Sequence, residues 1–165
     1  MPHVIEPASS GRAKCRGCGV AIKKDEIRLG EKLPNPFAEG EMTHWYHPIC
    51  AAFKRPETFL EVAGDQPGSI EDCERLVAQA KIGAEHRRVP RINGAQKSPT
   101  GRASCRSCRE LIAKDTWRIA LVFYEDGRYQ PSGFIHAGCA AEYLGTIEVE
   151  WPARHFADEI SDEDW

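Results

Sequence analysis

The sequence has no long apolar segment, and this absence excludes an integral membrane protein. Its longest uninterrupted apolar run extends only from Ile119 to Tyr124, whereas a membrane-spanning helix needs about 20 apolar residues. The N-terminal residues also lack the basic stretch followed by an apolar stretch that marks a secretory signal. We therefore expect an intracellular protein, located in the cytoplasm or nucleoid of a prokaryote or in the nucleus of a eukaryote.

The sequence also lacks the features of an enzyme and of a disulfide framework. No glycine-rich phosphate-binding loop is present, and neither Cys73 nor His155 has an evident partner for nucleophilic catalysis. The cysteine count of 7 is odd, and a reducing compartment keeps thiols unpaired. We therefore expect a protein without catalytic activity whose cysteines are thiols or metal ligands.

An excess of basic charge is missing as well. There are 22 Lys and Arg residues against 25 Asp and Glu residues, which gives a formal net charge of -3. Overall acidity argues against nucleic-acid binding, but net charge is a poor guide when one segment holds most of the negative charge. Here the residues after Leu144 hold seven acidic side chains and one basic side chain. The remainder of the chain is therefore basic.

Two segments of the chain share one pattern. Residues 11–18 read Gly-Arg-Ala-Lys-Cys-Arg-Gly-Cys, and residues 101–108 read Gly-Arg-Ala-Ser-Cys-Arg-Ser-Cys. The similarity continues to His47 and His136, with a shift of one position on the way. Such internal similarity indicates a duplicated unit.

Each copy contains a Cys-x2-Cys pair, a long loop and a His-x2-Cys pair. Three thiolates and one imidazole form a closed tetrahedral site of the structural zinc type, with no open position for catalysis. Reduced buried cysteines or a redox pair are the alternatives, but neither explains why the distant His and Cys occur twice. His44 could compete with His47, although the second copy has Gly133 at that place. We predict two zinc ions per chain, bound by Cys15, Cys18, His47 and Cys50, and by Cys105, Cys108, His136 and Cys139.

Cys73 has no counterpart in the repeat. It lies in residues 69–82, where apolar residues recur at helical spacing and Ser69 with Asp72 resembles a capping box. The spacing predicts a helix with Cys73 on its apolar face. A small core thiol is the interpretation that we favour over a further metal ligand or a nucleophile.

The remaining pattern predicts an α+β fold made of two small zinc-stabilised fingers, each with a short antiparallel sheet and helices. Strands are expected at 27–33 and 117–124, second strands at 42–46 and 133–135, and a short helix after the last cysteine of each copy. Residues 84–97 carry basic residues, Pro and Gly without an apolar period, which predicts a flexible linker. The expected domains are a finger with its following helix at 1–83, a basic linker at 84–97, a second finger at 98–145 and an acidic tail at 146–165.

These residues resemble a known family. The Gly11-Arg12-Ala13 lead to the cysteines, the Lys24-Asp25 pair with Arg28, and the His44-Trp45-Tyr46-His47 approach are similar to the poly(ADP-ribose) polymerase-type zinc finger, which also occurs in a nick-sensing DNA ligase. The second copy keeps the Gly-Arg-Ala lead but has Gly133-Phe134-Ile135 in place of His-Trp-Tyr. This departure concerns its binding surface and leaves its metal ligands intact.

The resemblance implies recognition of DNA strand breaks by shape. Basic residues would bind phosphates, which agrees with the fit of guanidinium groups to phosphate oxygens. Apolar residues on the loop before the His ligand would stack on bases exposed at a nick or end. The implied phosphate ligands are Arg12, Arg28, Arg102 and Arg118, and the implied stacking residues are Phe37, Met42 and Tyr129, with Tyr124 as a weaker candidate.

Other readings of these residues remain open. Phe37 and Tyr129 could pack under their turns as ordinary core aromatics, and Lys24 and Lys114 could be solvated lysines rather than phosphate ligands. At the level of function, we expect a monomeric, non-enzymatic sensor or adaptor in DNA repair, with any repair enzyme acting in trans. The alternative is a protein-interaction module with purely structural fingers and an acidic tail that docks on a partner.

Overall fold

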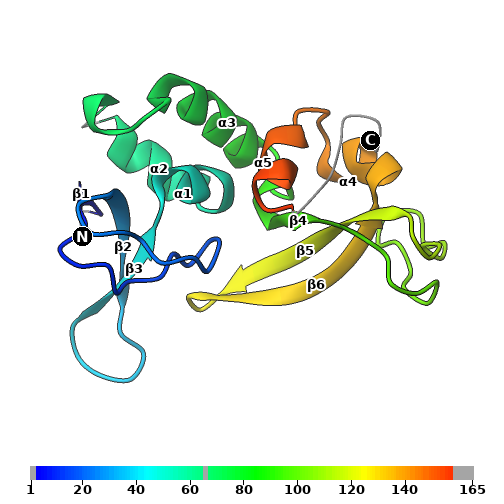
Figure 1. Cartoon of the computed structure of the whole chain (residues 1–165), viewed down its shortest axis with the longest axis horizontal. Coiled ribbons are helices and arrows are strands. Elements are labelled where there is room, and N and C mark those ends of the chain that lie inside the picture. Colours follow the sequence, from blue (N-terminus) through cyan, green and yellow to red (C-terminus); the bar gives the residue numbers. More distant parts are fainter. Residues whose placement is uncertain (1–2, 65–66, 158–165) are drawn as a thin grey trace. The chain divides into compact units, whose positions relative to one another are not determined.

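The structure is a computed structural model, and it describes residues 3–64 and 67–157. The chain divides into two compact units, Met1–Glu85 and His86–Trp165, each with its own three-stranded antiparallel sheet (Figure 1). This arrangement confirms the predicted α+β fold of two small fingers. Among the described residues, no helix is long and apolar enough to cross a membrane.

The first unit packs helices against one face of its sheet. Alternation along the strands points Leu29 and Tyr46 toward the helices, where both are fully buried with Phe59. The neighbouring positions point to the opposite face, which carries Trp45. The elements are β1 (Val4–Pro7), β2 (Ile27–Pro34) and β3 (Glu41–Tyr46), followed by α1 (Pro48–Lys54), α2 (Pro56–Ala63), the 3-10 turn η1 (Pro67–Ser69) and α3 (Cys73–Glu85).

A buried ion pair fastens the helices of the first unit to its sheet. Glu31 of β2 is 1% exposed, and its carboxylate accepts hydrogen bonds from Arg55 Nε at 2.9 Å and from Thr58 Oγ1 at 2.5 Å. The second unit has Leu121 at the corresponding position, and it is also buried. The two copies therefore use different chemistry at the same place.

The second unit repeats this sheet but closes it with other helices. Its hydrophobic core gathers side chains from the sheet and from both helices, among them Ile92, Ile119 and Ala153. The elements are the 3-10 turn η2 (Val89–Arg91), β4 (Ile92–Lys97), β5 (Trp117–Glu125), β6 (Arg128–His136), the 3-10 turn η3 (Ala137–Cys139), α4 (Ala140–Leu144) and α5 (Glu150–His155).

The structure corrects two predicted boundaries. Residues 92–97 of the predicted linker form β4, which pairs with β5, and the side chains of Val89, Ile92 and Ala95 are buried in the core. The predicted acidic tail begins with α5, whose contact with β4 completes the same core. Burial of apolar surface therefore decides the structure of both segments against their polar composition. The last residues of the tail, 158–165, lie outside the described part of the chain.

Most predicted elements are present with small changes at their ends. The predicted strands correspond to β2, β3, β5 and β6. The helix predicted at 69–82 runs from Cys73 to Glu85, and Cys73 is buried as expected. Gly145 ends α4 in the left-handed conformation with φ 78°, which glycine adopts without steric cost.

Candidate metal centres and nucleic-acid interface

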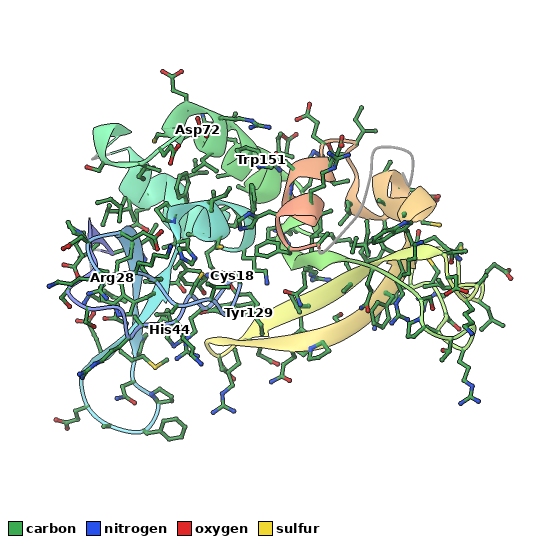
Figure 2. The ribbon with its side chains drawn as sticks, viewed as in Figure 1. Cys18, Arg28, His44, Asp72, Tyr129 and Trp151 are labelled. Carbon is green, nitrogen blue, oxygen red and sulfur yellow. The ribbon has the colours of Figure 1, made fainter. Side chains whose placement is uncertain are left out.

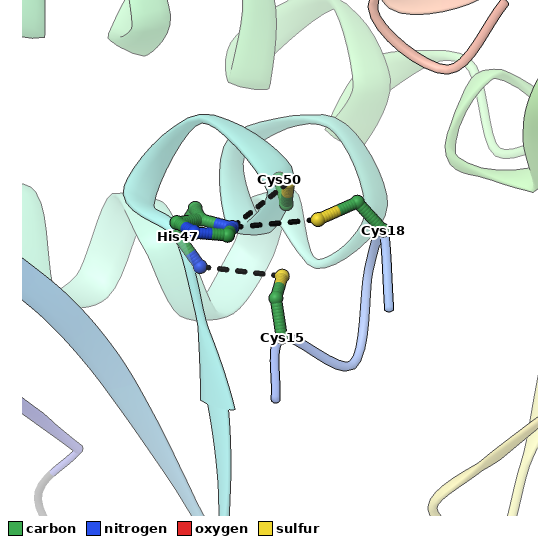
Figure 3. A group of neighbouring side chains, drawn as sticks. All are labelled: Cys15, Cys18, His47 and Cys50. Carbon is green, nitrogen blue, oxygen red and sulfur yellow. Dashed lines mark hydrogen bonds between the residues drawn. The ribbon is translucent and has the colours of Figure 1, made fainter. Parts of the chain in front are cut away.

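The first predicted metal site is a compact cluster. Cys15 and Cys18 come from the loop after β1, His47 follows β3 and Cys50 lies in α1 (Figure 3). The ring Nδ1 of His47 lies 3.4 Å from Cys18 Sγ and 3.9 Å from Cys50 Sγ. His44, the competing candidate, is absent from this cluster.

The second cluster has nearly the same geometry. Nδ1 of His136 lies 3.3 Å from Cys108 Sγ and 3.7 Å from Cys139 Sγ, and Cys105 completes the group. In both clusters the ligand atoms lie within 4.8 Å of one another. Zinc bonds of about 2.3 Å to sulfur and 2.0–2.1 Å to nitrogen require tetrahedral ligand separations of roughly 3.5–3.8 Å. Both groups therefore fit a tetrahedral zinc ion.

The environment of one cysteine in each cluster, Cys15 in the first and Cys105 in the second, favours the thiolate form. Its sulfur accepts two backbone N–H groups at 3.3 Å, from Gly17 and His47 in the first cluster and from Ser107 and His136 in the second. A hydrogen bond from the Cys50 thiol lowers the pKa of Cys15 to about 3, although burial opposes this.

Around Cys105, burial raises the pKa, but backbone N–H groups of Cys108, His136 and Ser107 outweigh it, so the pKa is lowered to about 6. Metal ligands must be deprotonated. Each cluster therefore presents a preformed thiolate to a metal ion.

The surroundings of the two clusters differ. His47 Nε2 faces the Glu26 carboxylate at 3.3 Å, and the buried Lys54 ammonium donates to the Gly17 carbonyl at 2.8 Å. A carboxylate partner orients a ligand histidine, and the lysine places positive charge beside three thiolates. In the second cluster, His136 Nε2 instead lies 3.2 Å from the Leu111 carbonyl.

The second cluster is also more open to solvent. Cys108 is exposed, whereas Cys18 at the same place in the repeat is only partly exposed. Tyr143 stands where the first unit has Lys54, because the offset between the copies is 89 positions in this region. The second unit therefore has no lysine at the position of Lys54; instead the Arg88 guanidinium stacks on the Tyr143 ring at 4.4 Å.

Arg28 and Arg118 occupy equivalent positions in the two sheets and lie on aromatic rings. The Arg28 guanidinium carbon is 3.6 Å from the Trp45 ring centroid, and that of Arg118 is 3.5 Å from the Phe134 ring centroid. Each arginine is 7% exposed. Arg28 projects from β2 (Figure 2). Phe134 thus takes over the role of Trp45 as the aromatic platform, despite the missing His-Trp-Tyr sequence.

The platform explains small residues in both copies. Trp45 pairs with Gly30 across the strands, and a Cβ added at Gly30 would lie 2.6 Å from the Trp45 ring. The smaller Phe134 pairs with Ala120, which has room for a methyl group. Gly133 has φ +90°, and a Cβ there would lie 2.8 Å from Arg106. A histidine like that of the first unit would therefore be strained at this position.

The other predicted DNA ligands differ in exposure. Arg12, Arg102, Lys24 and Lys114 are exposed, as phosphate ligands would be. Phe37 is 84% exposed in the loop between β2 and β3, where its backbone N–H is held by Asn35 Oδ1 at 2.9 Å. The alternative interpretation, in which Phe37 packs under its turn, is therefore wrong, and the prediction that Phe37 stacks on DNA bases stays open.

Met42 and Tyr129 are only partly exposed. The Tyr129 ring packs on Tyr124 with 4.9 Å between centroids, and the two residues pair across β5 and β6 next to a tight turn. Within residues 86–157, the second unit thus has no loop that presents an aromatic side chain as the first unit presents Phe37. The ordinary packing interpretation fits Tyr129.

Comparison with known proteins places these features in a family. The family described as the poly(ADP-ribose) polymerase and DNA-ligase Zn-finger region matches residues 6–84. Poly [ADP-ribose] polymerase 1 of Gallus gallus is 31% identical over 134 residues, covering 72% of this chain and 13% of its own length. The chain belongs to the PARP-type zinc-finger family.

Two insect relatives support the same assignment. Poly [ADP-ribose] polymerase of Drosophila melanogaster is 26% identical over 140 residues, covering 76% of this chain and 14% of the relative. That of Sarcophaga peregrina is 26% identical over 172 residues, covering 92% of this chain and 17% of the relative. The chain thus spans less than a fifth of the length of these PARP-type relatives, and the similarity extends over both fingers.

Proposed function

We propose that this chain binds DNA at nicks and ends through its two PARP-type fingers, without catalysing a reaction itself. The observation that carries the proposal is Phe37, an aromatic ring 84% exposed at the tip of a finger that also presents arginines. A large apolar side chain that is exposed to solvent is available to stack on a base that has lost its neighbour. Such stacking contributes about 1–3 kcal/mol to the free energy of binding.

Charge supports the same proposal. Arg12 and Arg102 are exposed at equivalent positions of the two units, and their planar guanidinium groups suit phosphate oxygens. Arg28 and Arg118 add a second guanidinium to each unit, oriented by its aromatic platform. Phosphates are present on every duplex, so these contacts set affinity, and base stacking sets the preference for breaks.

Zinc is the metal that we assign to both clusters. When bound, it would hold the two ends of each loop together, because four protein ligands leave no position for a substrate. The metal therefore has a structural role in this proposal. Any chemistry on the broken DNA belongs to an enzyme that acts in trans, for which this chain is a sensor or adaptor.

The test separates affinity from discrimination. Binding of the zinc-loaded chain to nicked, blunt-ended and covalently closed DNA is measured by fluorescence anisotropy at moderate salt. Arg28→Ala is expected to weaken binding to every DNA, because it removes a phosphate contact. Phe37→Ala with Met42→Ala is expected to reduce the preference for nicks and ends, while Tyr129→Ala, the control in the second unit, changes that preference less.

Equal affinity of the wild-type chain for closed and nicked DNA would contradict break recognition. It would leave the protein-interaction module as the better explanation, with the fingers serving only as structural supports.

A further inference from the structure

The two aromatic platforms differ in one charge. In the first unit, Arg28 Nη2 donates to Glu6 Oε1 at 3.0 Å, and Glu6 lies directly opposite Arg28 in the pairing of β1 with β2. In the second unit, the residue opposite Arg118 in the pairing of β4 with β5 is Gln96. The copies therefore place a carboxylate and a neutral amide at the same position.

No carboxylate lies opposite Arg118 to offset its charge. The structure shows no ion pair for it within residues 3–64 and 67–157, and its nearest hydrogen-bond partner is the neutral Ser98 Oγ at 3.5 Å. Its Nε is buried without a hydrogen-bond partner. Arg28 is buried to the same extent and also stacks on an aromatic ring. The two arginines can therefore be compared directly, and the main difference between their sites is the Glu6 carboxylate.

We propose that Glu6 competes with DNA phosphate for Arg28, and that Gln96 relieves this competition at Arg118. The inference rests on the proposed function. The Glu6 side chain is 47% exposed, and its carboxylate already occupies Arg28 Nη2, a donor that a phosphate oxygen would otherwise receive. The second unit therefore contributes more of the phosphate affinity than the first.

The expected size follows from the electrostatics of the Glu6 carboxylate, which is 47% exposed. A phosphate that contacts Arg28 would lie roughly 5 Å from the Glu6 carboxylate, and in water-like surroundings that repulsion corresponds to about 3–10-fold in affinity. Removal of the carboxylate also restores one positive charge for counterion release, so the slope of log affinity against log salt should steepen by up to about 0.9.

Reciprocal substitutions test the proposal on the full zinc-loaded chain. Glu6→Gln gives the first unit the residue of the second, and Gln96→Glu does the reverse. Affinities for nicked and closed DNA are measured between about 50 and 200 mM salt, the range in which phosphate contacts respond strongly. Glu74→Gln on α3, an exposed residue, makes the same charge change away from the sheet and serves as the control.

We expect Glu6→Gln to bind both DNAs 3–10-fold more tightly, Gln96→Glu to bind both more weakly by a similar factor, and the control to change little. Weaker binding by Glu6→Gln would overturn the proposal, because it would mean that the carboxylate orients Arg28 for DNA. Unchanged affinity in both variants, while Arg28→Ala still weakens binding, would also overturn it. A wild-type chain that binds no DNA would instead overturn the proposed function.

Discussion

The buried ion pair of Glu31 allows a prediction about stability. The second unit of the same chain indicates which substitutions should compensate for its loss. Glu31→Leu would remove the carboxylate that receives Arg55 Nε at 2.9 Å and Thr58 Oγ1 at 2.5 Å. Removal of one partner of a buried pair costs about 3–5 kcal/mol, because the other partner keeps its desolvation penalty. The Arg55 side chain is 25% exposed and can reach water, so we expect a loss near 3 kcal/mol.

The second unit shows how this loss can be recovered. It places buried leucines, Leu121 and Leu144, at the positions of Glu31 and Arg55. Replacement of a whole buried ion pair by apolar residues of similar volume is often neutral or stabilising. Glu31→Leu combined with Arg55→Leu and Thr58→Val should therefore recover most of the stability that Glu31→Leu loses.

The assay is thermal and urea unfolding of the full chain in excess zinc, followed by circular dichroism. For a unit of this size, about 3 kcal/mol corresponds to a fall in melting temperature of roughly 12–24 °C. Leu121→Glu is the reciprocal control and should destabilise the second unit, because it buries a carboxylate without these partners. A triple variant as unstable as the single variant would refute the reasoning, since it would place the loss in packing rather than in unmet polar groups.

The metal centres and a buried histidine give three further predictions. The purified chain should contain two zinc ions, and Cys73→Ser should leave that content intact, as metal analysis would show; one zinc or none in a folded sample would contradict the duplicated site. A chelator should remove the zinc of the second unit first, because Cys108 is exposed and Lys54 has no counterpart there. Spectra that report on each unit separately would check this order, and simultaneous loss of both zinc ions would contradict it. Burial lowers the pKa of His44 below its usual 6.5, so the unfolded chain binds the extra proton more readily and stability is lost as pH falls below about 6.5. His44→Phe should flatten that part of the stability profile, and an unchanged slope would exclude His44 as its source.

The metal ligands could be predicted from sequence because their chemistry depends on residue type and spacing alone. Strands such as β5 were also predictable, since they are rich in aromatic and β-branched residues. β4 was not, because Ile-Asn-Gly-Ala-Gln-Lys has no alternating pattern and forms a strand only through its pairing with β5.

The contacts around the site were less accessible to sequence reasoning. Glu6, Glu26 and Lys54 are ordinary surface residue types, and their roles depend on tertiary neighbours that lie 21 to 37 residues away along the chain. The burial of Arg28 has the same origin, since Trp45 reaches it across the strands. The duplication offered one usable signal, namely the change from Glu6 to Gln96.

The contact between β4 and the end of α5 has a consequence for protein engineering. A Cβ on Gly94 would overlap the carbonyl oxygen of Phe156, so the first strand of the second unit and the last described residues of that unit lie side by side. A folded module whose first strand lies beside its last residues can be inserted into a surface loop of a host protein through short linkers. Residues 86–157 are therefore the piece to graft, whereas a graft that began at residue 98 would leave its core open along one edge.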